Sequence, residues 1–352
     1  MMKPIRTSVG VTLILTLLTT IGCFDQKSNT AEQPKTEKGV TVQPDKSLAW
    51  TDDTVTLYVP GKPGGSSDLT TRFLANGWAA KTGIRFSVKN FNSTVASFTQ
   101  LSNRKPNGNE LSITHSAIFT QYVTGASNIE PINDVTLIAH MGNNGLRAIA
   151  VRKDAPYNTF AELIAYMKKH PNTVKAGVSP NGTTQFLLGT LEHNLGVKFK
   201  YVEASQETDR LTSLAGGFID LGTVSLSNGK EYDQAGKLKI LGTVGANGAV
   251  ISDFLSNAPD NYKTLQEMGY QNCYAVTNYY VIGPKNMDPA LVKKINASLK
   301  DLANKNNPYF IGMKGMGQVA QWYSTEDSMI HYKDEYHVKE TVAKSLGIYR
   351  EE

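Results

Sequence analysis

The stretch Val55-Thr56-Leu57-Tyr58-Val59-Pro60-Gly61-Lys62-Pro63-Gly64-Gly65-Ser66-Ser67-Asp68-Leu69 runs from β-branched and aromatic residues into a loop of glycine and serine. Apolar residues at helical spacing follow, at Leu69, Phe73, Leu74 and Trp78. The pattern predicts a strand, a glycine-rich loop and a helix in direct succession. The free N–H groups at the start of such a helix favour a negatively charged ligand.

A second stretch repeats this arrangement. Val174 to Val178 is typical of a strand, residues 179–184 (Ser-Pro-Asn-Gly-Thr-Thr) of a loop, and Phe186 to Leu191 of a helix. Each loop alone has a second interpretation, because Ser67 and Thr183 are common N-cap residues and glycine is common in turns. The repetition favours two loops that bind the two ends of one small anion.

The rest of the chain alternates strands with helices, which is typical of α/β sheets covered by helices on both faces. The predicted strands are residues 54–59, 84–88, 111–114, 148–151, 174–178, 199–202, 219–224, 238–244 and 279–282. The predicted helices beyond the two loops are 94–101, one around Phe119, 159–170, 208–215 and 289–302. About 300 residues follow residue 49, more than one core usually supports, so two lobes are expected.

The N-terminus has the features of an export signal. Two basic residues precede an apolar run at residues 9–18 that is too short to span a membrane. The run ends at Ile21-Gly22-Cys23, which resembles a bacterial lipobox and predicts acylation of Cys23; cleavage that leaves Cys23 unmodified is the alternative. Residues 1–23 are therefore expected to form a lipoprotein signal peptide, and the polar residues 24–49 a disordered tether.

Composition and motifs argue against several functions. The formal charge of +5 is spread without a long basic run, so nucleic-acid binding is not indicated. Apart from Cys23 the chain has one cysteine, Cys273, so an internal disulfide would require Cys23 to stay free. No His-Glu-x-x-His motif, Gly-x-Ser-x-Gly elbow or phosphate-binding loop ending in Gly-Lys-Ser/Thr occurs in the sequence. We expect neither catalysis nor a cofactor or metal.

Several motifs agree in order and spacing with those of one known family. They are Pro63 to Asp68, Pro106 to Gly108, Thr159 to Leu163, Lys175 to Thr184, Leu214 to Asp220, Ala235 to Leu241 and Tyr280 to Pro284. Over Val55 to Leu302 the chain resembles the substrate-binding proteins of tripartite tricarboxylate transporters, the Bug receptors. Asn90 to Val95 and Glu203 to Ser205 depart from the family pattern, so the resemblance does not define the solute.

The resemblance implies a two-lobed α/β structure, the periplasmic binding protein type II fold, with the ligand cleft between the lobes. Residues 50–146 plus 278–352 would form a discontinuous lobe 1, and residues 147–277 would form lobe 2. The crossings between lobes would lie near residues 147–151 and 278–283. Each glycine-rich loop then belongs to a different lobe, and hinge closure would bring the loops together around a solute.

The resemblance further implies an extracytoplasmic, lipid-anchored protein of the cell envelope, in the periplasm or at the cell surface. It would capture a small carboxylate or related organic anion and deliver it to membrane transporter subunits. We expect it to act as a monomer. The alternatives are a surface lipoprotein that reuses the fold for adhesion or sensing and, less favoured, a hydrolase.

The candidate ligand-binding residues come from three regions and one neighbouring arginine. The first loop contributes Gly64, Gly65, Ser66, Ser67 and Asp68; the strand near residue 114 contributes Thr114, His115 and Ser116; the second loop contributes Ser179, Asn181, Gly182, Thr183 and Thr184. Neutral N–H and O–H donors suit reversible binding of an anion. Arg147 could bind a carboxylate bidentately or lie on the surface, and Lys62 could contact the ligand or be solvated in its loop.

Overall fold

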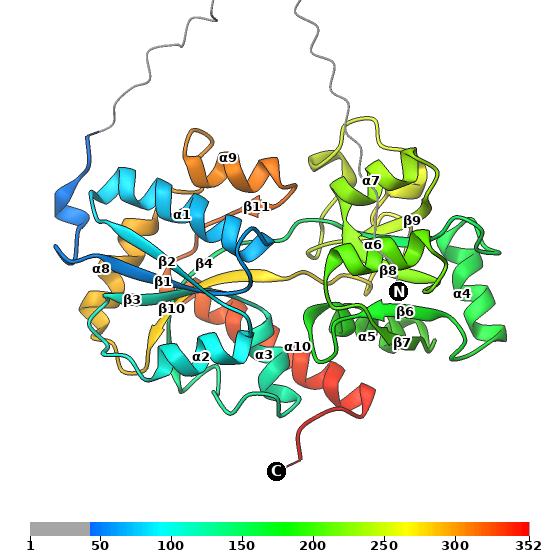
Figure 1. Cartoon of the computed structure of the whole chain (residues 1–352), viewed down its shortest axis with the longest axis horizontal. Coiled ribbons are helices and arrows are strands. Elements are labelled where there is room, and N and C mark those ends of the chain that lie inside the picture. The colour runs from blue at the N-terminus through cyan, green and yellow to red at the C-terminus, as the bar shows by residue number, and fades with distance from the viewer. Residues whose placement is uncertain (1–42, 352) are drawn as a thin grey trace, which may run out of the picture. The chain divides into compact units, whose positions relative to one another are not determined.

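The computed structural model describes residues 43–351, which belong to one compact unit containing two β-sheets (Figure 1). Cys23 and most of the expected tether lie outside the described residues. Residues 45–49, at the end of that segment, are ordered: Lys46–Leu48 forms a short 3-10 helix, and the Asp45 N–H donates to the Lys81 carbonyl at 2.8 Å. Within residues 43–351, every helix is too short or too polar to cross a membrane.

The first sheet has six strands in the order β11-β4-β10-β3-β1-β2. Their bounds are β1 Val55–Pro60, β2 Phe86–Phe91, β3 Glu110–His115, β4 Val135–Asn143, β10 Asn278–Pro284 and β11 Val319–Ala320. β1 is parallel to both β2 and β3, whereas β10 is antiparallel to β3 and β4. A strand from late in the chain, β10, thus lies between two early ones and brings the end of the chain back to this sheet.

Helices cover both faces of the first sheet (Figure 1). One face carries α1 Ser66–Thr82, α8 Pro289–Leu299 and α9 Pro308–Gly315; the other carries α2 Thr94–Ser102, α3 Ala117–Val123 and α10 Thr325–Leu346. Side chains of β1 alternate between the two cores, because successive residues of a strand point to opposite faces. Leu57 packs in the cluster that contains Trp78, and Tyr58 in the cluster that contains Phe119.

The second sheet has five strands in the order β7-β6-β8-β5-β9. Their bounds are β5 Arg147–Arg152, β6 Lys175–Val178, β7 Lys200–Glu203, β8 Leu221–Ser225 and β9 Leu238–Val244. One face packs against α4 Phe160–Lys169 and α5 Thr183–Leu195, the other against α6 Glu207–Ala215 and α7 Leu226–Gln234. Two further 3-10 turns, Ile251–Asp253 and Asp260–Tyr262, lie in the segment between β9 and β10. This sheet therefore has its own two-sided core.

Two neighbouring chain segments connect the two sheets. The chain leaves β4 and enters β5 through residues 144–146, and it returns to β10 through residues 275–277. The Asn144 N–H donates to the Thr277 carbonyl at 3.0 Å, and the Thr277 N–H donates to Asn144 Oδ1 at 3.0 Å. α10 adds a third connection, since it packs against both β4 and α5, with Val342 beside Phe186.

The expected α/β fold with helices on both faces of its sheets is confirmed, but several elements were not predicted. β4 was missed because its residues are buried on both faces, so it lacks the alternation that marks a half-exposed strand. α10, the longest helix of the described residues, was missed because charged and polar residues outnumber the apolar ones along it. α7, α9 and β11 are short and gave no distinct pattern.

Candidate ligand-binding cleft

A cavity of about 450 Å³ is lined by loops and helix starts from both sheets. The first sheet contributes residues 60–62 and 65–67 around the β1–α1 loop, His115 at the end of β3, and Tyr279 of β10. The second sheet contributes Ser179, residues 182–184, and the start of α6. Residues that are more than a hundred positions apart in the sequence thus share one cleft.

Two helices begin at this cleft without a side-chain cap. Gly65 is the N-cap of α1 and Gly182 that of α5, and neither offers a side-chain oxygen to the first-turn N–H groups. α3 also lacks a side-chain cap, but its Ala117 N–H donates to His115 Nδ1 at 3.2 Å. The other seven α-helices of residues 43–351 have a side-chain cap or a capping box. First-turn N–H groups without an internal partner are suited to an anion supplied from outside.

The first loop is held in shape by Asp68. Its carboxylate accepts hydrogen bonds from the Gly64 N–H at 2.8 Å, from Arg72 Nε at 3.0 Å and from Asn90 Nδ2 at 3.0 Å. Burial alone would raise the pKa of Asp68, but these hydrogen bonds together lower it below its usual value. Gly64 has φ +77°, a left-handed conformation that suits glycine. Asp68 therefore shapes the loop, and neither it nor Gly64 lines the cleft.

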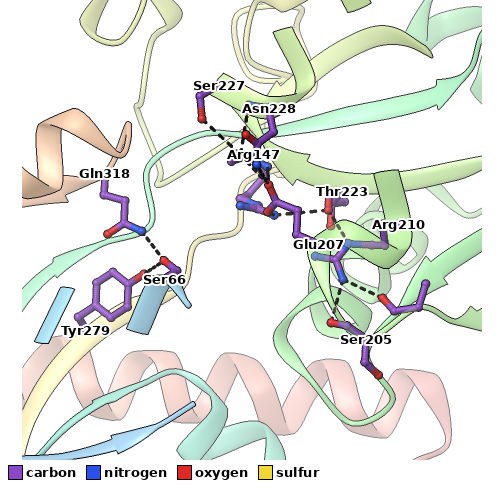
Figure 2. Close-up of polar contacts among 12 residues, drawn as sticks. Ser66, Arg147, Ser205, Glu207, Arg210, Thr223, Ser227, Asn228, Tyr279 and Gln318 are labelled. Carbon is purple, nitrogen blue, oxygen red and sulfur yellow. Dashed lines mark hydrogen bonds and ion pairs between the residues drawn. The ribbon is translucent and has the colours of Figure 1, made fainter. Parts of the chain in front are cut away.

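Ser66 and Ser67 are the loop residues that reach the cleft with hydroxyl groups. Ser66 Oγ lies 3.3 Å from the Tyr279 hydroxyl and accepts from Gln318 Nε2 at 2.6 Å. Figure 2 shows these three side chains together on one side of the cleft. Lys62 also lines the cleft and is exposed.

Of the three candidate residues at the end of β3, only one lies at the cleft. His115 lines the cleft; its Nδ1 accepts a backbone N–H, and burial lowers its pKa to about 4, so the ring is neutral at pH 7. Ser116 Oγ accepts from the Asn278 N–H at 2.8 Å and thereby ties β3 to β10. The Thr114 hydroxyl is buried without a hydrogen-bond partner in the described residues. Thr114 and Ser116 do not line the cleft.

The second loop forms a turn that leads into α5. The Gly182 N–H donates to the Ser179 carbonyl at 3.0 Å, and Asn181 has φ +55°, a left-handed conformation that asparagine tolerates. The Ser179 N–H donates to Thr184 Oγ1 at 2.8 Å. Ser179, Gly182, Thr183 and Thr184 line the cleft; Asn181 does not, and its carbonyl accepts from Gln121 Nε2 of α3 at 3.2 Å.

Opposite Ser66 and Tyr279 lies an ion pair between Arg147 and Glu207 (Figure 2). Arg147 Nη2 donates to Glu207 Oε2 at 2.5 Å, and the two side chains are 13% and 23% exposed. Burial alone would raise the pKa of Glu207, but the charge of Arg147 and hydrogen bonds from Arg147, Ser225 and Asn228 lower it to about 2. Glu207 is therefore a carboxylate throughout the physiological pH range.

Arg210 is buried beside this ion pair. It donates to the carbonyls of Thr223 at 2.8 Å, Ala204 at 2.8 Å and Ser205 at 3.1 Å. Burial and the nearby charge of Arg147 lower its pKa to about 10, so it remains a cation at pH 7. The Thr223 hydroxyl is fully buried at the cleft without a hydrogen-bond partner in the described residues.

The structure thus brings together nine candidates at the cleft and places five elsewhere. The nine are Gly65, Ser66, Ser67, His115, Arg147, Ser179, Gly182, Thr183 and Thr184. The cleft is also lined by four residues that no sequence pattern marked, Glu207, Arg210, Thr223 and Gln318. The departure from the family pattern at Glu203 to Ser205, just before Glu207, was the nearest signal to them. Within residues 43–351, His, Cys, Asp and Glu form no group of three that could hold a metal.

Comparisons with known proteins agree with this architecture. The model of the family described as tripartite tricarboxylate transporter family receptor matches residues 71–348. A UPF0065 protein of Bordetella pertussis is 23% identical over 302 residues, which cover 84% of this chain and 90% of that protein.

Two solved structures have a similar fold. An R. palustris protein with adipate aligns with a TM-score of 0.71 and 22% identity, over 84% of this chain and 98% of that one. The periplasmic binding protein BugD aligns with a TM-score of 0.69 and 20% identity, over 85% and 99% of the two chains. Because the family model covers most of the chain, the protein belongs to the family of tripartite tricarboxylate transporter receptors.

Proposed function

We propose that the protein is an exported solute receptor that binds a small carboxylate in the cleft and delivers it to a membrane transporter of the tripartite tricarboxylate type. The main support for this proposal is that α1 and α5, which pack on different sheets, both begin at the cleft with glycine N-caps and no side-chain cap. Carboxylate oxygens accept hydrogen bonds from such N–H groups and are stabilised by the helix dipoles.

The ligand contacts follow from the cleft lining. Hydroxyl groups of Ser66, Ser67 and Thr183 add neutral donors to the helix N-termini, and Arg147, whose charge is balanced by Glu207, adds N–H donors. A neutral His115 neither attracts nor repels an anion. The adipate in the R. palustris structure supports a carboxylate as the ligand class.

Capture requires the two sheets to move relative to each other. We assign residues 50–146 plus 278–352 to lobe 1 and residues 147–277 to lobe 2. Residues 144–146 and 275–277 then form the hinge, supported by the paired hydrogen bonds of Asn144 and Thr277. Closure would bring the N-termini of α1 and α5 onto the same solute, as in other two-domain receptors.

The remaining parts of the proposal concern the cell envelope. Acylation of Cys23 would anchor the protein to a membrane, and the residues before the folded unit would let it reach transporter subunits. A monomer suffices for this function, because both walls of the cleft come from one chain.

The test is a thermal-shift screen of the chain from residue 24 onward against mono-, di- and tricarboxylates. A ligand that binds only the folded state stabilises it by RT ln(1 + [L]/Kd), about 2.7 kcal/mol at a hundredfold excess over Kd. We expect at least one carboxylate to raise Tm and its amide analogue to have no effect. A screen without any shift would refute carboxylate binding.

A further inference from the structure

Hydrogen-bond donors surround both carboxylate oxygens of Glu207 at one end of the cleft. Its Oε1 accepts from the Ser225 N–H at 3.1 Å, the Ser225 hydroxyl at 2.6 Å and Asn228 Nδ2 at 2.7 Å. Its Oε2 accepts from Arg147 Nη2. A guanidinium, a backbone N–H, a hydroxyl and an amide are the donors with which proteins bind a ligand carboxylate. Glu207 is therefore an internal carboxylate in a carboxylate-binding environment.

Two other cations near Arg147 and Glu207 have partners of their own. Arg210 directs its hydrogen bonds to three backbone carbonyls. Lys339 of α10, which borders a small cavity together with Arg147, lies 3.6 Å from a Glu335 oxygen. Arg147 is the cation of this group that both lines the main cleft and pairs with Glu207.

Glu207 binds only one of the three nitrogens of the Arg147 guanidinium. Nη2 donates to Glu207 and lies 3.4 Å from the Thr223 carbonyl, whereas Nε and Nη1 have no hydrogen-bond partner within residues 43–351. Figure 2 shows Arg147 between Glu207 and the side of the cleft formed by Ser66 and Tyr279. A ligand group that approached the free nitrogens of Arg147 would have the negative charge of Glu207 behind the guanidinium.

We propose that Glu207 is a specificity-determining residue that makes the cleft select solutes with one carboxylate over dicarboxylates. The inference rests on the proposed carboxylate-receptor function. One carboxylate binds at the uncapped starts of α1 and α5, and the rest of the solute extends toward Arg147 and Glu207. A second carboxylate at that end would meet an arginine whose charge is already neutralised and would be repelled by Glu207. A neutral polar or apolar end avoids this repulsion.

The test measures Kd by calorimetry for matched pairs of acids: butanoate and succinate, pentanoate and glutarate, hexanoate and adipate. The wild type is compared with Glu207→Gln, which keeps the shape of the side chain and removes its charge. We expect the wild type to prefer the monocarboxylate of at least one pair, and the variant to shift the Kd ratio about tenfold or more toward the dicarboxylate. Glu207→Ala provides the same measurement if the Gln variant does not fold.

Asp209→Asn is the matched control. Asp209 lies in the same first turn of α6, accepts from the Gln206 N–H at 3.1 Å and does not line the cleft, so the same loss of charge should leave the ratio unchanged. A wild type that prefers dicarboxylates, or a ratio that Glu207→Gln does not move, overturns this inference alone. Failure of every carboxylate to bind either protein overturns the receptor function and the inference with it.

Discussion

The substitution Gly182→Ala tests whether the second loop, residues 179–184, contacts the ligand. Gly182 has φ −103°, which alanine adopts without strain, so the effect would come from packing alone. An added Cβ would lie 2.8 Å from Ser179 Oγ, 2.9 Å from Ser179 Cβ and 3.1 Å from the Ser179 carbonyl oxygen. Ser179 must therefore shift, together with its hydrogen bond to Thr184 at the cleft wall.

The magnitude follows from two opposing contributions. Overpacking of a tight site costs about 1–3 kcal/mol, and replacing glycine by alanine returns about 0.4–1 kcal/mol by restricting the unfolded chain. We expect a net loss of about 1–2 kcal/mol in the free energy of unfolding. At about 2–4 °C per kcal/mol, Tm falls by several degrees. Displacement of Ser179 should also weaken ligand binding about tenfold, the equivalent of one hydrogen bond.

Gly217→Ala is the matched control for stability. Gly217 has φ +72°, and a Cβ added there would have no neighbouring atom within 4 Å, so alanine costs about 1–2 kcal/mol through backbone strain, away from the cleft. The assay is calorimetric Kd for the carboxylate that gives the largest thermal shift, together with Tm of the free proteins. Unchanged affinity in Gly182→Ala, or equal loss of affinity in both variants, would show that loop 179–184 does not contact the ligand.

Three further predictions concern other parts of the molecule. The double substitution Ser67→Ala with Thr183→Ala removes one hydroxyl from each wall of the cleft and should raise Kd more than it lowers Tm; equal affinity would remove both side chains from the site. Burial lowers the pKa of His140 to about 4, below its unfolded value near 6.5, so its neutral form stabilises the fold above pH 6.5 and that stability is lost as pH falls toward 4. Linkage gives a loss of about 2 kcal/mol from His140 between pH 8 and pH 5, and a similar loss from His115, whose pKa is lowered to the same value. Denaturant titrations should show the sum, and His140→Gln should remove about half of it; an undiminished loss in the variant would contradict this role. Cys273 is buried, and burial raises its pKa to about 11, so in the chain from residue 24 a thiol reagent at pH 7.5 should react only after unfolding, and rapid reaction of the folded protein would exclude this burial.

The fold class was accessible from the sequence because hydrophobic periodicity and loop chemistry are local properties. The strand starting at Val55 and the amphipathic helix at Phe160 to Lys169 both lie where their patterns placed them. The motifs around residues 63–68 and 175–184 further indicated the family, which the match over residues 71–348 now shows. Elements without a clear period, such as β4 and α10, depend on burial by distant parts of the chain and gave no local signal.

Local sequence was enough to predict that two glycine-rich loops lead into helices, because the turn residues and the helical spacing stand next to each other in the chain. The folded structure was needed to show that both helices begin at one cleft and that Asp68 supports its loop instead of lining that cleft. It was also needed to show that Glu207, which no motif marks, pairs with Arg147 there. An ion pair between residues 60 positions apart depends on how β5 and α6 pack against each other, and the sequence pattern of neither element encodes that distance.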